Sequence, residues 1–576
     1  MSRFVSLGNT SRWLPRIFLA LEHYNFRHFI ADLIAGLTVG LVALPLAMAF
    51  GIASGVTPEA GIYTAVVAGF IISALGGSRT QIGGPTGAFV IIVAGIVAKF
   101  GLSGLYMVTL MAGGLLLVMG ITGLGAAVRF IPRPVTIGFT NGIALLIAST
   151  QIKDFFGLTT PALPSEFIER LTLLLEHAET VHWPAVTVAA GCLGIILFLP
   201  RVVRRVPGSI VALFAAAAIV AAFGLPIETI GSKFGGIPIG FPPMAIPKFR
   251  SELILPLLPS ALTVALLAAV ESLLSAVVAD SMTGDKHNSN AELIAQGVAN
   301  IVSPLVGGIP ATGAIARTAT NIRSGAKTPI AGIVHALTLL VILLVAAPLA
   351  RFIPLAALAA VLLVVAYNMG EWREVGSILK LSKADILVWA TTFSLTVLAD
   401  LTVAVEVGML LAALLYIYRV SQTTTVATVT DKSIHDGRPH ILQDKLLPPQ
   451  VSILRIRGPF LFGTTDKLAA ETADLKQFNQ VIILRLRDMT GIDATGLHAI
   501  EVFAKRVTRS GKVLLLCGAR DQPAQLLKQS DFVEHIGERN ILPHIAAALA
   551  RAREIAEDFG GLGYEVARDF RAHAPV

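Results

Sequence analysis

The chain has 576 residues, of which 54% are hydrophobic and 14% are charged, and its mean hydropathy is +0.75. This composition is too apolar for a wholly soluble protein of this length. The formal net charge of +8 does not indicate a nucleic-acid partner, because lysines and arginines at the cytoplasmic face of a membrane protein explain it.

Apolar runs of about twenty residues recur between Ile30 and Tyr418, as membrane-spanning helices require. We predict a membrane domain over residues 30–420 with fourteen segments. Their approximate bounds are 30–55, 59–75, 86–99, 105–125, 133–149, 183–199, 208–223, 255–281, 291–306, 312–324, 328–347, 353–367, 384–398 and 402–418. Pro45 lies inside the first segment and is expected to kink or unwind it at mid-membrane. We therefore include Pro45 among the substrate-binding candidates.

The positive charges between segments predict the topology. Lys and Arg are more frequent in the even-numbered connections, which places these connections and both termini in the cytoplasm. Fourteen segments then form two sets of seven with opposite orientation. Residues 1–29 form a cytoplasmic amino-terminal segment. This segment lacks a clear apolar core with a cleavage site, so we expect no removed signal peptide.

One short element occurs twice, as GGPTGAF at residues 83–89 and as GIPATGAI at residues 308–315. A Thr is favoured at a helix N-cap, where its hydroxyl accepts from a free N–H. The small residues that follow leave such N–H groups accessible to an anion. The substrate-binding candidates are Thr86, Gly87 and Ala88, and in the second copy Thr312, Gly313 and Ala314. Each copy alone is compatible with an ordinary turn, but interrupted segments at matching places in two halves indicate a transporter's binding site.

Glu271 lies within the apolar run LLAAVESLL. A charged side chain at bilayer depth costs about 2.5–3.5 kcal/mol on insertion scales, so such a residue is a functional candidate. Burial favours the protonated carboxyl, which suits Glu271 to bind and release a proton during transport. The alternative is a structural role, in which the carboxylate holds polar groups at a helix interface.

Several of these stretches together resemble the SulP family of anion transporters. They are GLTVG from residue 36, the element at residues 83–88, NAELIAQG from residue 290 and GAIARTA from residue 313. The resemblance covers nearly the whole chain. It implies a 7+7 inverted repeat, with a core domain that moves against a gate domain and an anion bound between the third and tenth helices. It also implies a cytoplasmic STAS domain and commonly a homodimer.

The resemblance also bears on coupling. Glu271 aligns with the acid expected to couple symport in proton-driven relatives. Ser275 stands where sodium-coupled bicarbonate relatives carry a second acid, which speaks against sodium coupling. Arg317 either adds a positive charge near the anion, as in vertebrate relatives, or points towards the cytoplasm as an orientation signal.

Residues 431–556 alternate short β-type runs with helices and predict a small α/β domain, followed by a tail over 557–576. We expect strands at 451–456, 481–486 and 512–517 and a helix at 494–509. The loop before this helix resembles the STAS signature, with Asp493 followed by Ala494 where relatives carry a phosphorylated serine. Thr495 is the next hydroxyl. It is either a second phosphorylation site or simply a helix-start residue. A role in assembly or regulation is therefore favoured over a phosphorylation switch, and a cytoplasmic partner of the STAS domain is a further candidate.

No Walker loop, zinc-ligand spacing or nucleophile elbow occurs in a suitable context, so we expect neither an enzyme nor a cofactor or metal. The sequence predicts secondary transport in the inner (plasma) membrane, with proton-coupled sulfate uptake by alternating access in first place. The alternatives are transport or exchange of bicarbonate or a dicarboxylate, an uncoupled anion channel, and a membrane-anchored regulator acting through its STAS domain.

Overall fold

The computed structural model describes residues 14–22, 24–126, 132–164, 166–203, 207–240, 244, 250–399, 401–429, 448–529 and 536–561. The predicted start of the soluble domain at Asp431 and most of the predicted tail lie outside these residues, as do residues 1–13. The chain divides into two compact units, Met1–Ala412 and Ala413–Val576. Each unit is described by itself.

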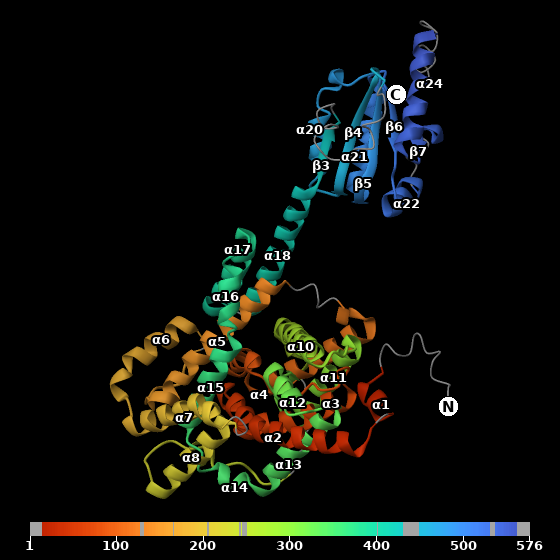
Figure 1. Cartoon of the computed structure of the whole chain (residues 1–576). Helices are drawn as coiled ribbons and strands as arrows, with labels where there is room; N and C mark the ends of the chain where they lie inside the picture. Colours follow the sequence, from red (N-terminus) through yellow and green to blue (C-terminus); the bar gives the residue numbers. More distant parts are fainter. Residues whose placement is uncertain are drawn as a thin grey trace. The chain divides into compact units, whose positions relative to one another are not determined.

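Helices make up nearly all of the first unit (Figure 1). They are α1 (Arg16–Leu21), α2 (Phe26–Ala53), α3 (Pro58–Leu75), α4 (Gly87–Thr122), α5 (Arg133–Phe156), α6 (Phe167–Glu176), α7 (Trp183–Val202), α8 (Gly208–Phe223), α9 (Ile230–Phe234), α10 (Ile254–Thr283), α11 (Ser289–Val302), α12 (Ile315–Arg323), α13 (Ile330–Val345), α14 (Ala347–Ala350), α15 (Leu355–Met369), α16 (Trp372–Ile378), α17 (Lys383–Leu398) and α18 (Leu401–Thr423), which crosses into the second unit. Every predicted segment overlaps one of these helices, and the third and fourth segments both lie on α4.

Membrane-spanning length is reached by seven helices of the described chain. They are Phe26–Ala53, Pro58–Leu75, Gly87–Thr122, Arg133–Phe156, Trp183–Val202, Ser251–Thr283 and Leu355–Ile378. The helices α8 and α13 are apolar but shorter. Short and interrupted apolar helices beside full-length ones agree with the predicted polytopic architecture.

Glycine and proline affect two of the long helices differently. Gly101 has φ 68° and ψ −176°, which breaks α4 between the predicted third and fourth segments. A left-handed φ of this kind favours glycine because it lacks a Cβ. The predicted unwinding at Pro45 is wrong, since α2 continues through this buried proline to Ala53. Packing against neighbouring helices allows a membrane helix to tolerate the lost N–H.

Small residues allow the helices to approach closely. A Cβ at Gly113 of α4 would lie 2.8 Å from the carbonyl oxygen of Gly297 in α11, and a Cβ at Gly297 would lie 2.9 Å from the carbonyl oxygen of Gly113. Such reciprocal backbone contacts stabilise helix pairs in lipid, where apolar burial does not drive association. Because α4 belongs to the first repeat and α11 to the second, the two repeats interlock.

The second unit contains a five-stranded sheet in the order β3-β4-β5-β6-β7. Its strands are β3 (Thr425–Thr428), β4 (Val451–Phe460), β5 (Val481–Ile492), β6 (Val513–Cys517) and β7 (Ile541–Leu542). Only the β3–β4 pair is antiparallel. One face packs on α21 (Ala494–Arg509), and the other on α24 (Ile545–Gly561). The predicted strands and helix are present, whereas the short strands β3 and β7 were not predicted.

Candidate functional site

The two copies of the repeated element meet in space. Gly83–Gly84 (β1) and Thr312–Gly313 (β2) form a two-stranded antiparallel ribbon, with Gly83 opposite Gly313 and Gly84 opposite Thr312. The amide of Ala314 donates to the carbonyl of Ile82 at 2.8 Å and extends the pairing. The ribbon therefore fixes the starts of α4 and α12 relative to each other.

The first copy ends at the amino terminus of α4. Thr86 is the N-cap residue, but its hydroxyl does not accept from an N–H of the first turn. It donates instead to Glu271 Oε2 on α10, at 2.9 Å. Thr86 therefore occupies the predicted N-cap position, but the predicted side-chain cap is absent, because the hydroxyl is turned towards the carboxylate of α10 and not towards the first turn of α4. The backbone N–H groups of Gly87 and Ala88 are consequently not covered by this side chain.

The second copy is built differently. The helix α12 begins at Ile315 with Ala314 as its N-cap, so the predicted start at Thr312 is wrong. The Thr312 hydroxyl donates to the carbonyl of Ala268 on α10, at 2.8 Å. A Cβ at Gly313 would overlap the Gln81 amide. Thr312 and Gly313 thus pack against protein atoms rather than an open site.

The surroundings of Gly87 are less crowded than those of Gly313, although Gly87 is buried. A Cβ there would lie 3.3 Å from Met369 Sδ and 3.4 Å from side-chain carbons of Ile147 and Phe50. These three side chains form a close wall around the first turn of α4. The two copies are therefore similar in sequence but differ in how tightly their glycines are packed.

The side chain of Arg317 points into the first unit. Its side chain is 3% exposed, and its Nη2 donates to the carbonyl of Pro85 beside the ribbon. Nη1 has no hydrogen-bond partner among the described residues. Arg317 is close enough to Glu271 for an electrostatic interaction. The guanidinium thus places a positive charge at the start of α4 instead of pointing to solvent.

Glu271 borders a cavity of about 600 Å³. The lining comes from α5, α10, α16's N-cap and the start of α11 and α12, and its polar members include Thr136, Thr140, Glu271, His287, Ser289 and Glu371. The cavity reaches Ile315, the first residue of α12, but Thr86, Gly87 and Thr312 do not line it. Glu271 therefore lies between the cavity and the start of α4. Pro45 is buried in α2 and does not line the cavity.

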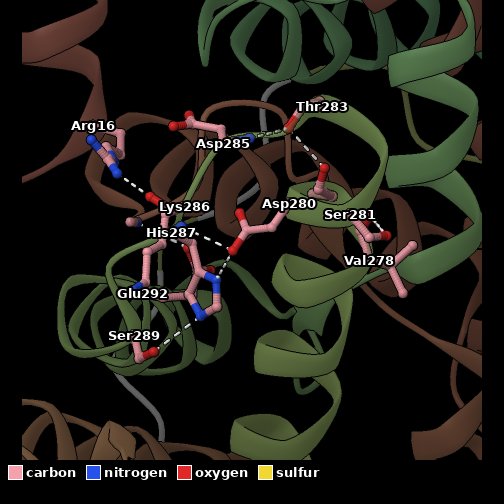
Figure 2. A network of polar contacts seen from close by, with 12 residues as sticks. Arg16, Val278, Asp280, Ser281, Thr283, Asp285, Lys286, His287, Ser289 and Glu292 are labelled. Atoms are coloured by element: carbon pink, nitrogen blue, oxygen red, sulfur yellow. Dashed lines mark hydrogen bonds and ion pairs between the residues drawn. The ribbon is translucent and has the colours of Figure 1, made fainter.

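A hydrogen-bond network holds the loop between α10 and α11. Asp280 Oδ2 pairs with His287 Nδ1 at 2.6 Å, and His287 Nε2 contacts the Ser289 hydroxyl at 3.0 Å. Both contacts can be followed in Figure 2. The backbone N–H of His287 also donates to Asp280 Oδ2, at 3.1 Å. This network fixes His287 and Ser289 in the cavity wall.

A second buried carboxylate, Glu292 on α11, was missed by sequence reasoning. Its Oε2 accepts from the N–H of Gly77 at 2.9 Å, and its Oε1 accepts from Ser272 at 3.0 Å and Gln296 at 2.9 Å. Gln81 also donates to the Ser272 hydroxyl, at 2.8 Å. Glu292 thus connects α11 with the backbone of Gly77, which precedes the ribbon, and with Ser272, the residue after Glu271. A Glu and a Gln four residues apart in an apolar helix were the available signal.

Replacing Glu292 with alanine is expected to destabilise the first unit by about 3 kcal/mol or more, because it orphans three buried donors at about 1–3 kcal/mol each. Thermal unfolding in detergent measures this effect. The control is Glu374→Ala, because Glu374 pairs with a largely exposed Arg133 at 2.8 Å and such pairs contribute at most about 1 kcal/mol. Equal unfolding midpoints for the two variants would contradict the structural role of Glu292.

In the second unit Asp493 is a helix cap. Its Oδ1 accepts from the N–H of Gly496 at 2.8 Å, and its Oδ2 accepts from the N–H of Phe462 at 2.9 Å. Thr495 is exposed in the first turn of α21. Asp493 therefore joins the end of β4 to α21, and Thr495 stays accessible.

The profile of the "Sulfate permease family" matches residues 29–392, and that of the "STAS domain" matches residues 444–550. The chain belongs to the sulfate permease family. The Bacillus subtilis family member named "Putative sulfate transporter YvdB" is 42% identical over 524 residues, covering 90% of this chain and 97% of that protein. The "Bicarbonate transporter BicA" of Picosynechococcus is 31% identical, with 92% and 95% covered.

Solved structures agree with this assignment. The transmembrane domain of a cyanobacterial BicA matches with a TM-score of 0.60 and 32% identity, covering 68% of this chain and 98% of that one. Murine Slc26a9 in the inward-facing state has a TM-score of 0.84 at 18% identity, with 94% of each chain covered, which supports the fold alone. The predicted family and the predicted polytopic helical fold with a carboxyl-terminal STAS domain are confirmed. The protein is a multi-pass membrane protein of an anion transporter family.

Proposed function

We propose that this protein is a secondary active transporter that moves an inorganic anion, with sulfate in first place, together with a proton by alternating access. The observation that supports this most is the contact between Thr86 and Glu271 at 2.9 Å. It joins a titratable carboxyl on α10 to the amino terminus of an interrupted helix, where anions bind favourably.

The anion binds at the start of α4. The N–H groups of Gly87 and Ala88 donate to it, and the side chains of Phe50, Ile147 and Met369 form the apolar wall. Arg317 supplies positive charge from the ribbon side. The roles assigned to Thr312, Gly313 and Ala314 become indirect, because these residues hold the ribbon that orients α4. Pro45 becomes a packing residue of α2.

The proton is carried by Glu271. When Glu271 is protonated, the negative charge next to the anion disappears, so binding of the proton and of the anion favour each other. Co-transport of a proton also reduces the charge that crosses the membrane, where each elementary charge moved against the potential costs about 2.3 kcal/mol per 100 mV. An uncoupled channel would need no such carrier.

Bicarbonate is the second candidate substrate. It is favoured by the 31% identity with BicA over 92% of the chain and by the similarity to its transmembrane domain. Sulfate is favoured by the higher identity, 42%, with YvdB. A dicarboxylate and an exchange mode fit the same donors, since backbone N–H groups attract many anions.

We further propose that the protein resides in the inner (plasma) membrane with both termini in the cytoplasm, as its positive charges predict. A homodimer and a cytoplasmic partner of the STAS domain complete this proposal. The exposed Thr495 beside the Asp493 cap is the position at which such a partner, or a modification, acts.

Transport by the purified protein in proteoliposomes tests the proposed function. We expect an inward proton gradient to drive accumulation of labelled sulfate, with the membrane potential clamped at zero. Bicarbonate, succinate and chloride are compared under the same conditions. Uptake of bicarbonate but not sulfate would replace the first candidate by the second. Anion flux without accumulation under any proton gradient would contradict proton coupling.

A further inference from the structure

Two arginines and a cysteine form a row across the sheet of the second unit. Arg455 on β4 lies opposite Arg485 on β5, and Arg485 lies opposite Cys517 on β6. Side chains alternate between the two faces of a strand. The preceding residues Leu454, Leu484 and Leu516 belong to the core beneath α21. The row therefore lies on the face that α24 covers, next to Ile453, Ile483 and Leu515 of that core.

The two neighbouring arginines of this row repel each other. Neighbouring strands are about 4.8 Å apart, and like charges directly opposite destabilise a sheet. Arg485 is 5% exposed, and its Nη1 has no hydrogen-bond partner among the described residues. A buried cation without a full set of partners carries a large desolvation penalty. Arg485 Nη1 is therefore a buried donor that an anion could use.

Further positive charge lies beside this row. Burial lowers the pKa of Arg455, and the charges of Arg457 and Arg485 lower it further, whereas Asp488 opposes them. Asp488 lies 4.0 Å from Arg455. The described part of this group thus brings three guanidinium groups together, with Asp488 beside Arg455. Arg457 is exposed, so this group of arginines reaches solvent.

The row reaches a loop on its β6 side. Cys517 is the last residue of β6, and the chain leaves the sheet at Gly518, where φ is 77°. Arg455 and Arg485 lie within β4 and β5, which continue to Phe460 and Ile492.

We propose that Arg485, with Arg455 and Arg457 at its rim, binds a tetrahedral oxyanion dianion of the sulfate and phosphate class. The planar guanidinium fork matches two oxygens of such an anion. This site is separate from the one at the start of α4 and does not depend on which anion the helical unit carries. It would allow the soluble domain to respond to an oxyanion in the cytoplasm.

The test uses the full-length protein in detergent, because both units are then present. Hydrogen exchange is followed by mass spectrometry with sodium sulfate, sodium phosphate, AMP or sodium chloride at matched ionic strength. We expect sulfate or a phosphate species, but not chloride, to slow exchange over residues 453–459 and 483–489. This local readout separates the proposed site from any anion bound near residues 83–91. Slowing by sulfate alone identifies free sulfate as the ligand, and slowing by phosphate or AMP identifies phosphate chemistry.

Three variants make the test specific. Arg485→Met should remove the slowing and weaken binding by more than about tenfold, the loss expected for one charge-assisted hydrogen bond. Without anion it should be at least as stable as the parent, since replacing a buried charge by an apolar side chain is often neutral or stabilising. Arg457→Met changes an exposed residue and should weaken binding while the fold is kept. Arg509→Met, on α21 at the opposite face, is the matched control and should behave as the parent.

Several results would overturn the proposal. No local slowing with any of the oxyanions, or equal slowing with chloride, would show that the row is not an oxyanion site. Unchanged slowing in both Arg485→Met and Arg457→Met would show the same. Arg485→Met could also destabilise the protein without anion, while Arg457→Met leaves hydrogen exchange unchanged. This result would show that groups of the protein, and not an anion, are the partners of the Arg485 guanidinium.

Discussion

Glu271→Gln is expected to abolish anion accumulation driven by a proton gradient while anion binding and counterflow persist. Glutamine imitates the protonated carboxyl, so it still contacts the Thr86 hydroxyl that lies 2.9 Å from Glu271 Oε2. It cannot release a proton. A gradient of one pH unit corresponds to about 1.4 kcal/mol and supports about tenfold accumulation when one proton accompanies each anion. We expect this tenfold accumulation to fall to equilibration.

The measurement is uptake of labelled sulfate into proteoliposomes with the potential clamped, beside counterflow without a gradient. Glu406→Gln is the matched control, because Glu406 is an exposed carboxylate of the same unit, on α18. It should accumulate sulfate as the parent does. If Glu271→Gln also concentrates the anion, Glu271 is structural and another group couples the proton. If the variant loses counterflow as well, the carboxyl is needed for binding itself.

The second large effect is expected for Gly87→Leu. The new side chain would press against Met369, Ile147 and Phe50, because a Cβ at this position already lies 3.3–3.4 Å from them, and it would cover the first N–H groups of α4. Loss of two charge-assisted hydrogen bonds, at about 1.5–3 kcal/mol each, weakens anion binding by roughly 100-fold or more. Gly87→Ala should give a smaller loss, because the nearest atoms are the ends of flexible side chains.

Binding of labelled sulfate to purified protein measures this loss. The matched control is Gly95→Leu in the same helix, because a Cβ at Gly95 meets no atom within 4 Å. It should bind sulfate as the parent does. An unchanged affinity in a folded Gly87→Leu variant would remove the start of α4 from the anion site. Gly313→Leu is a poorer test, since its side chain would collide with Gln81 and disturb the network around Ser272.

The sequence was sufficient to predict the helices and to find the repeated element. It was not sufficient to predict which contacts each of the two copies makes. Hydropathy predicts long apolar helices, and the glycine-rich approach to Thr86 indicates an interruption. The pairing of Gly83 with Gly313 was not predictable, because strands of two residues carry no periodicity. The contact from Thr86 to Glu271 spans 185 residues. Only the fold reveals that the hydroxyl donates to this carboxylate instead of capping its own helix.

In the second unit, too, the sequence predicts the elements but not the contacts between them. Alternating apolar residues predict β4, β5 and β6 and the helix α21, since the pattern is set by local burial. The same pattern does not reveal that Arg455, Arg485 and Cys517 share one row, because this depends on the register between strands. The orientation of Arg317 was open for the same reason. Its inward position depends on the ribbon, whose two strands are far apart in sequence.

The ribbon between the repeats also constrains how the protein is made. During synthesis β1 emerges roughly 230 residues before its partner strand, because Gly83 pairs with Gly313. At about 5–20 residues per second this interval lasts roughly 10–50 seconds. For that time the backbone groups of the first strand and the close-packing face around Gly113 lack their partners in the second repeat. The first seven segments therefore stay in the membrane without these partners, and the insertion machinery or a chaperone has to shield them until residues 297–313 of the second repeat have been made.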